Sequence, residues 1–358
     1  MSFWTGRNVF VTGATGLLGS WVTAELLRRH ATVICLVRDW VPDSEAFRAG
    51  TLARCRLVRG KLEDFPVVLR ALNEYEVDSV FHLGAQTIVG TASRSALSTF
   101  ESNIRGTWTL LEAARQCASR IERIIVASSD KAYGQHERLP YTEDTPLLGR
   151  YPYDVSKTCA DLIAQSYFHS YGLPIAITRC GNLYGGGDLN FNRLIPGTIR
   201  SVLLDQSPVI RSDGSCVRDY FFVGDAVEAY LELAEHVPGP GFTGEAYNFG
   251  TETPLGVIAM ATKILEVMDR PSLPLTILNQ ATNEIPRQYL DCTKAREQLG
   301  WLPHYTLESA LAETVEWYSK WLAHSRADES GRPVQRSTGY SPLIRPAGVA
   351  GRGPRIPG

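Results

Sequence analysis

Residues 7–19 read RNVFVTGATGLLG, in which a short β-branched and aromatic run enters a turn with a glycine at every third position. Residues 20–29 follow with apolar side chains at helical spacing. A glycine-rich turn between a strand and a helix lets the backbone approach a pyrophosphate, which the positive N-terminus of the helix attracts. The spacing is GxxGxxG rather than the commoner GxGxxG, but alternating strand and helix segments come after it. The pattern therefore predicts nucleotide binding in preference to a purely structural turn, with contacts from Gly13, Thr15, Gly16, Leu17, Leu18 and Gly19.

The predicted second strand, residues 32–37, ends at Arg38-Asp39. An acidic side chain at this strand end usually binds the adenosine ribose hydroxyls of NAD, whereas an arginine favours the 2′-phosphate of NADP. Val37 stands where the acid is usual and Arg38 comes next. This register favours NADP, with Asp39 as the argument for NAD and a merely solvated Arg38 as a third interpretation.

Three further strands are predicted at residues 57–62, 78–86 and 123–128, with an amphipathic helix over 100–114. Strands that alternate with helices indicate an α/β fold of the Rossmann type, with a doubly wound parallel sheet. Such sheets bind ligands at the carboxyl edge of their strands. The strand at 123–128 therefore brings the residues after it to a binding edge.

The chemically richest segment is SSDKAYG at 128–134, with YDVSK at 153–157 after it. Tyr153 and Lys157 are four residues apart, so on a helix they share one face. A cation beside a phenol lowers the phenol's pKa, which would make Tyr153 a usable base near neutrality. This arrangement predicts proton and hydride transfer on an alcohol, and Ser129, Asp130 and Lys131 add acid and base groups for a second reaction.

Composition excludes several other classes of function. The chain has 358 residues, 44% of them hydrophobic, and 36 basic against 38 acidic residues, so there is no electrostatic case for nucleic acid or an anionic membrane. The seven cysteines are scattered without a CxxC pair, which predicts neither a metal site nor a disulfide framework. No signal sequence or membrane span is recognisable, and we expect a cytoplasmic protein.

The motifs GATGLLG, FHLGAQ, SSDKAYG and YDVSK, in this order, resemble the extended short-chain dehydrogenase/reductase family of nucleotide-sugar epimerases and dehydratases. Later segments agree, and the resemblance covers about residues 7–321. It implies a Rossmann domain over 1–180 with a return segment near 218–250, and a smaller α/β sugar-nucleotide domain from 181–217 and 251–323. The composition of 324–358, rich in Arg, Ser, Gly and Pro, indicates a flexible tail.

The resemblance also implies a tightly bound, recycled NAD(P)+ cofactor and a nucleotide-sugar substrate. Beyond the glycine turn, expected cofactor contacts are Arg38, Asp39, Lys61, Leu62, Leu83, Ala85, Gln86, Asn103, Ser128, Tyr153, Lys157 and Arg179. Expected substrate contacts are Gln86, Ser129, Asn182, Asn192, Arg193, Arg218 and Arg287. Lys61 stands where this family commonly has an adenine-contacting Asp. A homodimer is expected through the helices at 100–114 and 153–171.

Family members share one opening step, in which Tyr153 deprotonates the sugar's 4-hydroxyl and hydride leaves C4. A 4,6-dehydratase then needs an acid for the 6-hydroxyl and a base for the C5 proton, roles implied for Asp130 and Lys131. The Asp-Lys pair resembles the CDP-glucose 4,6-dehydratase branch, and a dehydratase is the leading interpretation. A 4-epimerase or a keto-sugar reductase would need only Ser129, Tyr153 and Lys157. Asp130-Lys131 would then be a structural ion pair. A further alternative is a protein that binds the cofactor as a sensor and has no catalytic activity.

Overall fold

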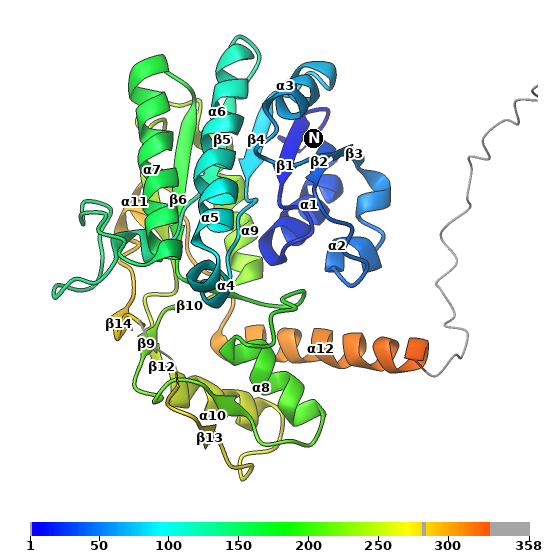
Figure 1. Cartoon of the computed structure of the whole chain (residues 1–358), viewed down its shortest axis with the longest axis vertical. Helices are drawn as coiled ribbons and strands as arrows, with labels where there is room; N and C mark the ends of the chain where they lie inside the picture. The colour runs from blue at the N-terminus through cyan, green and yellow to red at the C-terminus, as the bar shows by residue number, and fades with distance from the viewer. Residues whose placement is uncertain (1, 281–283, 330–358) are drawn as a thin grey trace, which may run out of the picture. The chain divides into compact units, whose positions relative to one another are not determined.

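The structure is a computed structural model that describes residues 2–280 and 284–329. Its centre is a seven-stranded parallel sheet with the strand order β11-β6-β5-β4-β1-β2-β3 (Figure 1). The strands are β1 (Asn8–Thr12), β2 (Thr32–Val37), β3 (Arg56–Arg59), β4 (Ser79–His82), β5 (Arg123–Ala127), β6 (Ile175–Cys180) and β11 (Ala246–Phe249). This confirms the predicted doubly wound parallel sheet, and the order reverses between β1 and β4, where such sheets bind ligands.

Helices cover both faces of the sheet (Figure 1). The helices α3 (Phe65–Glu74), α6 (Gly106–Gln116) and α7 (Pro152–Tyr171) pack side by side, and α1 (Leu17–Arg28) packs against α9 (Val223–His236). A π-helical turn at Glu101–Arg105 precedes α6. Several shorter elements lie between these strands and helices. They are α2 (Glu45–Arg48), α4 (Val89–Arg94), α5 (Ala96–Phe100), α11 (Thr293–Leu299) and the 3-10 turns Leu52–Arg54 and Asp130–Tyr133.

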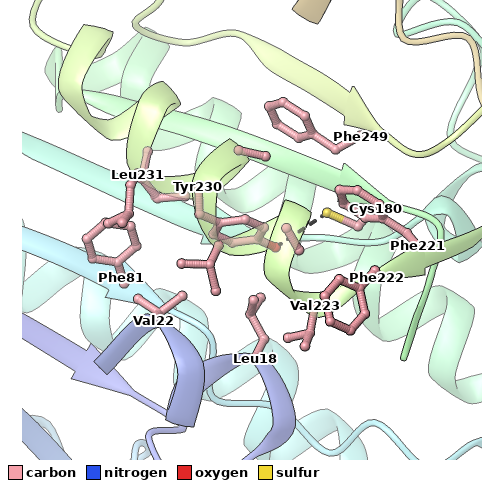
Figure 2. Close-up of a cluster of buried hydrophobic side chains, with 14 of the residues drawn as sticks. Leu18, Val22, Phe81, Cys180, Phe221, Phe222, Val223, Tyr230, Leu231 and Phe249 are labelled. Atoms are coloured by element: carbon pink, nitrogen blue, oxygen red, sulfur yellow. Dashed lines mark hydrogen bonds between the residues drawn. The ribbon is translucent and has the colours of Figure 1, made fainter. Parts of the chain in front are cut away.

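Alternation along the strands divides the core in two. On β1, Val9 and Val11 belong to one buried cluster and Phe10 to the other, as expected for a strand covered on both faces. Figure 2 shows the first cluster, in which Leu18 of α1 and Tyr230 of α9 approach each other. Both clusters consist of hydrophobic side chains, one on each face of the sheet.

The remaining elements of the described part of the chain come after β6. They are three helices and seven short strands, and the strands form three small sheets of their own. These elements are β7 (Asn182–Tyr184), α8 (Leu194–Leu203), β8 (Val209–Ile210), β9 (Val217–Arg218), β10 (Tyr220–Phe222), β12 (Leu255–Gly256), α10 (Val257–Val267), β13 (Thr276–Ile277), β14 (Arg287–Gln288) and α12 (Leu307–Glu329). The strands pair as β10-β7, β12-β9-β14 and β13-β8.

The described residues up to Tyr318 form one compact unit, and the described residues from Ser319 onward fall outside it. The predicted divisions between a Rossmann domain and a sugar-nucleotide domain, near residues 180, 218 and 250, fall within the first unit, and they stay predictions. The predicted end of the sugar-nucleotide domain at 323 lies beyond that unit. The predicted tail at 324–358 lies outside the described residues beyond 329. No helix in the described part of the chain is long and apolar enough to cross a membrane.

Candidate active site

A cavity of about 1030 Å³ opens at the carboxyl ends of the central strands. Its wall includes Thr12 at the end of β1, Leu83 after β4 and Cys180 at the end of β6. From there it extends past the N-terminus of α7 to β8, so strand ends and the small sheets both contribute to it. A site of this kind can hold an elongated, two-part ligand.

The glycine turn borders the cavity with backbone that has no room for side chains. Gly13 has a φ of +76°, and a Cβ placed there would lie 2.8 Å from the Cα of Gly84. A Cβ on Gly19 would lie 2.0 Å from the carbonyl oxygen of Gly13. The six residues predicted to contact a nucleotide all line the cavity: Gly13, Thr15, Gly16, Leu17, Leu18 and Gly19.

Tyr153 and Lys157 both reach the cavity from α7, as their spacing predicts. The Lys157 ammonium donates a hydrogen bond to the carbonyl oxygen of Ala127 at 2.7 Å, and burial lowers the pKa of Lys157 to about 8. Burial raises the pKa of Tyr153 to about 12, and the Asp130 carboxylate adds to this while a hydrogen bond with Ser129 opposes it. The predicted lowering of the phenol's pKa is therefore wrong for the protein alone, because loss of solvation is the largest effect and outweighs the opposing charge of Arg193.

Ser129, Asp130 and Lys131 form a compact group at the end of β5. The Ser129 hydroxyl donates to Asp130 Oδ1 at 3.0 Å and accepts the Lys131 backbone N–H at 3.2 Å. Ser129 and Lys131 line the cavity, whereas Asp130 lies behind them and is buried. Lys131 Nζ lies 3.6 Å from Asp130 Oδ2, and burial lowers the pKa of Lys131. The group thus offers a hydroxyl and an amine directly to a ligand, with a carboxyl in contact with both.

Three further side chains were not predicted. Asp154 lines the cavity beside Tyr153, and burial raises its pKa to about 6. Arg211 lines the cavity near Asn192, to which it donates a hydrogen bond at 2.5 Å. Gln288 of β14 accepts a hydrogen bond from Lys131. Adjacency to Tyr153 could have drawn attention to Asp154, but no local pattern connects residues 131 and 288.

The other predicted cofactor residues fall into two groups. Arg38, Asp39, Leu62, Leu83, Ala85 and Ser128 line the cavity with the glycine turn. Lys61, Gln86, Asn103 and Arg179 are not among its lining residues. Lys61 is exposed, and Asn103 joins the Gln86 backbone to the Ser156 hydroxyl, so it supports the wall from behind. Arg179 is buried against Asp161, with two hydrogen bonds of 2.9 and 3.0 Å.

The residues on the cavity side fit a dinucleotide. Ser128 Oγ is buried and has no hydrogen-bond partner among the described residues, so this wall of the cavity offers an unused polar atom. The glycine turn at the start of α1 offers backbone N–H groups suited to a pyrophosphate. Arg38 and Asp39, paired at 2.6 Å, stand at the rim where an adenosine ribose is bound in such folds.

The far end of the cavity is rich in arginine. Of the predicted substrate residues, Asn182, Asn192, Arg193 and Arg218 line it together with Ser129, while Gln86 and Arg287 do not. Arg218 is buried, with Nη2 3.5 Å from a Glu284 carboxylate oxygen, and Arg193 pairs with Asp188 at 2.8 Å. Several guanidinium groups at one end of a cavity suit a diphosphate. Arg287 is exposed, and its predicted contact with a nucleotide has no support from the described geometry.

The chain as a whole is similar to enzymes that act on nucleotide sugars. The family model for GDP-mannose 4,6 dehydratase matches residues 10–314. A CDP-glucose 4,6-dehydratase of Salmonella typhimurium is 32% identical, over 90% of this chain and 93% of its own. A dTDP-glucose 4,6-dehydratase of Haemophilus influenzae is 30% identical, over 87% of this chain and 97% of its own.

Two solved structures have similar folds. A dTDP-glucose 4,6-dehydratase of Streptomyces venezuelae with bound NAD has a TM-score of 0.79 and 29% identity, covering 88% of this chain and 97% of its own. A UDP-glucose 4-epimerase of Thermotoga maritima with UDP-glucose has a TM-score of 0.80 and 26% identity, covering 88% and 100%.

Proposed function

Because the chain belongs to the GDP-mannose 4,6 dehydratase family, an NAD(P)-dependent family of nucleotide-sugar enzymes, we propose that it is an NDP-hexose 4,6-dehydratase. The proposed product is an NDP-4-keto-6-deoxyhexose. The observation that carries the proposal is Lys131 in the cavity wall beside Ser129 and Tyr153, with Asp130 in contact behind them. An epimerase has no use for this extra acid and base.

A nicotinamide cofactor held by the glycine turn and Lys157 would supply the acceptor for hydride from C4 and the donor of that hydride to C6. Ser129 and Tyr153 hold the sugar's 4-hydroxyl, and Tyr153 takes its proton. Burial keeps the phenol protonated in the protein alone, so the positive charge of an oxidised nicotinamide in the cavity would help to lower its pKa. Lys157, bound to the Ala127 carbonyl, is placed to bind the cofactor's ribose.

Elimination starts from the 4-keto sugar, whose C5–H bond is acidified by the carbonyl. Lys131 takes the C5 proton and the electron pair moves into the enolate. The C6–O bond then breaks as an acid gives its proton to the leaving hydroxyl, and water is lost. Asp130 is the proposed acid. Asp154 is a second carboxyl in the wall whose pKa of about 6 leaves part of it protonated near neutral pH.

The CDP-sugar is the first substrate to test, because the Salmonella relative is named for CDP-glucose. The purified protein would be incubated with CDP-glucose, dTDP-glucose, UDP-glucose and GDP-mannose while product mass is monitored. Loss of one water without net consumption of cofactor supports the proposal and names the nucleotide. Comparison of Asp130→Asn with Asp154→Asn then identifies the acid, because only its replacement should stop water loss while C4 oxidation continues.

A 4-epimerase is the second candidate, since the Thermotoga structure with UDP-glucose is one and the shared step needs only Ser129, Tyr153 and Lys157. An unchanged mass with an inverted C4 would support it. Consumption of one NADPH per sugar would indicate a keto-sugar reductase instead. A cytoplasmic homodimer is proposed in each case, through Trp108 of α6 and Leu162 of α7, which are 45% and 50% exposed.

A further inference from the structure

Lys131 is joined to a strand from a distant part of the chain. Gln288 of β14 is completely buried, and its Oε1 accepts a hydrogen bond from Lys131 Nζ. The Nε2 of the same amide donates to the carbonyl oxygen of Asp130 at 2.7 Å. The Gln288 side chain therefore binds both the backbone of Asp130 and the amine of Lys131.

The two hydrogen bonds fix the orientation of the amide. A rotation of the Gln288 amide by half a turn would place its NH₂ group against the Lys131 amine and its oxygen against the Asp130 carbonyl. Both contacts would be between like groups, two donors and two acceptors. The oxygen of Gln288 therefore stays directed at Lys131, and β14 is held in turn by its parallel pairing with β9, where Gln288 stands opposite Arg218.

We propose that Gln288 is a positioning residue that holds the Lys131 amine toward the cavity as the base for the sugar's C5 proton, an inference that rests on the proposed dehydratase function. In its neutral form the amine donates one N–H to Gln288 and keeps its lone pair for the substrate. It then gains the C5 proton and becomes an ammonium, while the electron pair of the C–H bond passes into the enolate.

Without this acceptor, the closest alternative partner is Asp130 Oδ2, 3.6 Å from Nζ. Closure of that gap would give a direct ion pair, which favours the charged lysine and withdraws it from the substrate. The Oδ2 atom has no hydrogen-bond partner among the described residues, so it would accept such a bond. Gln288 thus competes with Asp130 for the amine.

The charges that face Lys131 come from three elements. Asp130 of its own turn and Asp154 of α7 raise its pKa, while burial, which is the largest effect, and Arg218 of β9 lower it. Gln288 is neutral, so it holds the amine in position without adding a charge. A carboxylate in its place, as in Gln288→Glu, would have nearly the same shape and would add a negative charge within hydrogen-bond distance. It would also lose the hydrogen bond that the amide donates to the Asp130 carbonyl oxygen.

The first test needs no substrate. Lys131 would be labelled with acetic anhydride at a series of pH values, and its modification measured by peptide mass spectrometry in the wild type and Gln288→Glu. The neutral amine reacts, so a pKa raised by one unit lowers labelling roughly tenfold below the pKa. We expect at least that decrease, with no change in Gln298→Glu, a matched variant at an exposed glutamine of α11. Equal labelling of wild type and Gln288→Glu would overturn the inference.

The second test separates oxidation from elimination. In Gln288→Leu and Gln288→Glu we expect the rate of C4 oxidation, followed as formation of reduced cofactor, to stay within about twofold of wild type. The rates of deuterium exchange at C5 and of water loss should fall roughly tenfold or more. In Gln288→Glu the acid limb of the elimination rate should also move to higher pH. A parallel fall of oxidation and elimination, with an unchanged pH profile, would show a structural role and overturn the inference.

These measurements also separate the inference from the proposed function. If wild type dehydrates no nucleotide sugar but labelling of Lys131 falls in Gln288→Glu, the dehydratase proposal fails while Gln288 still positions the amine. If wild type dehydrates its substrate and the variants eliminate normally, the function stands and the inference fails. Thermal unfolding of each variant confirms that it is folded.

Discussion

Arg179 and Asp161 form a closed ion pair inside the protein, with the guanidinium of one donating two hydrogen bonds to the carboxylate of the other. Their side chains are 4% and 0% exposed. The Arg179 guanidinium also donates to the Tyr133 hydroxyl at 3.0 Å and to the Glu143 carbonyl oxygen at 3.0 Å. An arginine with its donors used in this way has little capacity left for a cofactor.

The pair leads to a prediction about stability. Replacement by Arg179→Met leaves the Asp161 carboxylate buried without its partner, which should cost about 3–5 kcal/mol of unfolding free energy in urea denaturation. The double variant Arg179→Met/Asp161→Leu should recover much of this loss. Arg296→Met, which breaks an exposed pair with Glu252, is the control and should cost less than about 1 kcal/mol. A loss of cofactor affinity without loss of stability would restore the original interpretation of Arg179.

The second prediction concerns Tyr153. If this phenol is the base for the 4-hydroxyl, as proposed, Tyr153→Phe should lower the rate of C4 oxidation by roughly 10²–10⁴-fold. Formation of reduced cofactor in a single turnover measures that step directly. Tyr171→Phe, at the exposed end of the same helix, should leave it unchanged. Retained oxidation in Tyr153→Phe would exclude the assigned role.

The third prediction is a dependence of stability on pH from Lys157. Its pKa falls from 10.5 in the unfolded chain to about 8 in the folded protein. Between these values the unfolded chain holds a proton that the folded protein has released, so the free energy of unfolding rises with pH across this window. The full rise is at most about 3 kcal/mol. Urea unfolding of cofactor-free protein at about pH 7.5, 8.5 and 9.5 should show the rise in wild type and in Lys263→Met, but not in Lys157→Met.

The fourth prediction concerns cofactor choice. If Arg38 binds a 2′-phosphate, Arg38→Ala should weaken NADP binding by roughly 10–100-fold and leave NAD binding nearly unchanged, as expected for a charge-assisted hydrogen bond. Asp39→Ala should have the opposite effect, because Asp39 is the partner of Arg38 at 2.6 Å and the residue suited to a free ribose. Titration calorimetry with both cofactors measures the ratio. Equal losses of affinity for NAD and NADP in Arg38→Ala would show that Arg38 does not bind the 2′-phosphate.

The fifth prediction tests assembly. Trp108 of α6 and Leu162 of α7 are large, exposed apolar side chains on helices that pack against each other. Trp108→Glu should convert the proposed dimer into a monomer, as seen by light scattering, because a charge at the centre of an apolar interface loses its solvation. Leu302→Glu, at an exposed leucine outside both helices, is the control.

The sequence predicts best where neighbours along the chain are also neighbours in space. The glycine turn joins β1 to α1, and Tyr153 and Lys157 share one helix, so both are recognisable from spacing alone. The parallel sheet is predictable from the alternation of strands and helices. The cofactor role expected for Arg179 rests on the family resemblance, but its partner Asp161 lies on α7 and no local pattern connects the two.

The pKa of Tyr153 shows a different limit. Spacing reveals a cation near the phenol, but not the depth at which both are buried, and burial decides the direction of the shift. Gln288 cannot be found from the sequence at all, since its contact with Lys131 depends on the pairing of β14 with β9. Contacts between residues so far apart in the chain require the assembled fold.

The connection between β14 and the turn after β5 has an evolutionary consequence. The groups proposed to bind the cofactor and to act in C4 oxidation lie on α1, α7 and the turn after β5. The amide proposed to orient Lys131 comes from a two-residue strand far along the chain. If Gln288 positions Lys131 as proposed, substitutions in that strand would alter the second reaction and leave oxidation itself intact. Relatives with different second reactions could then differ in this strand, without any alteration of the nucleotide-binding turn.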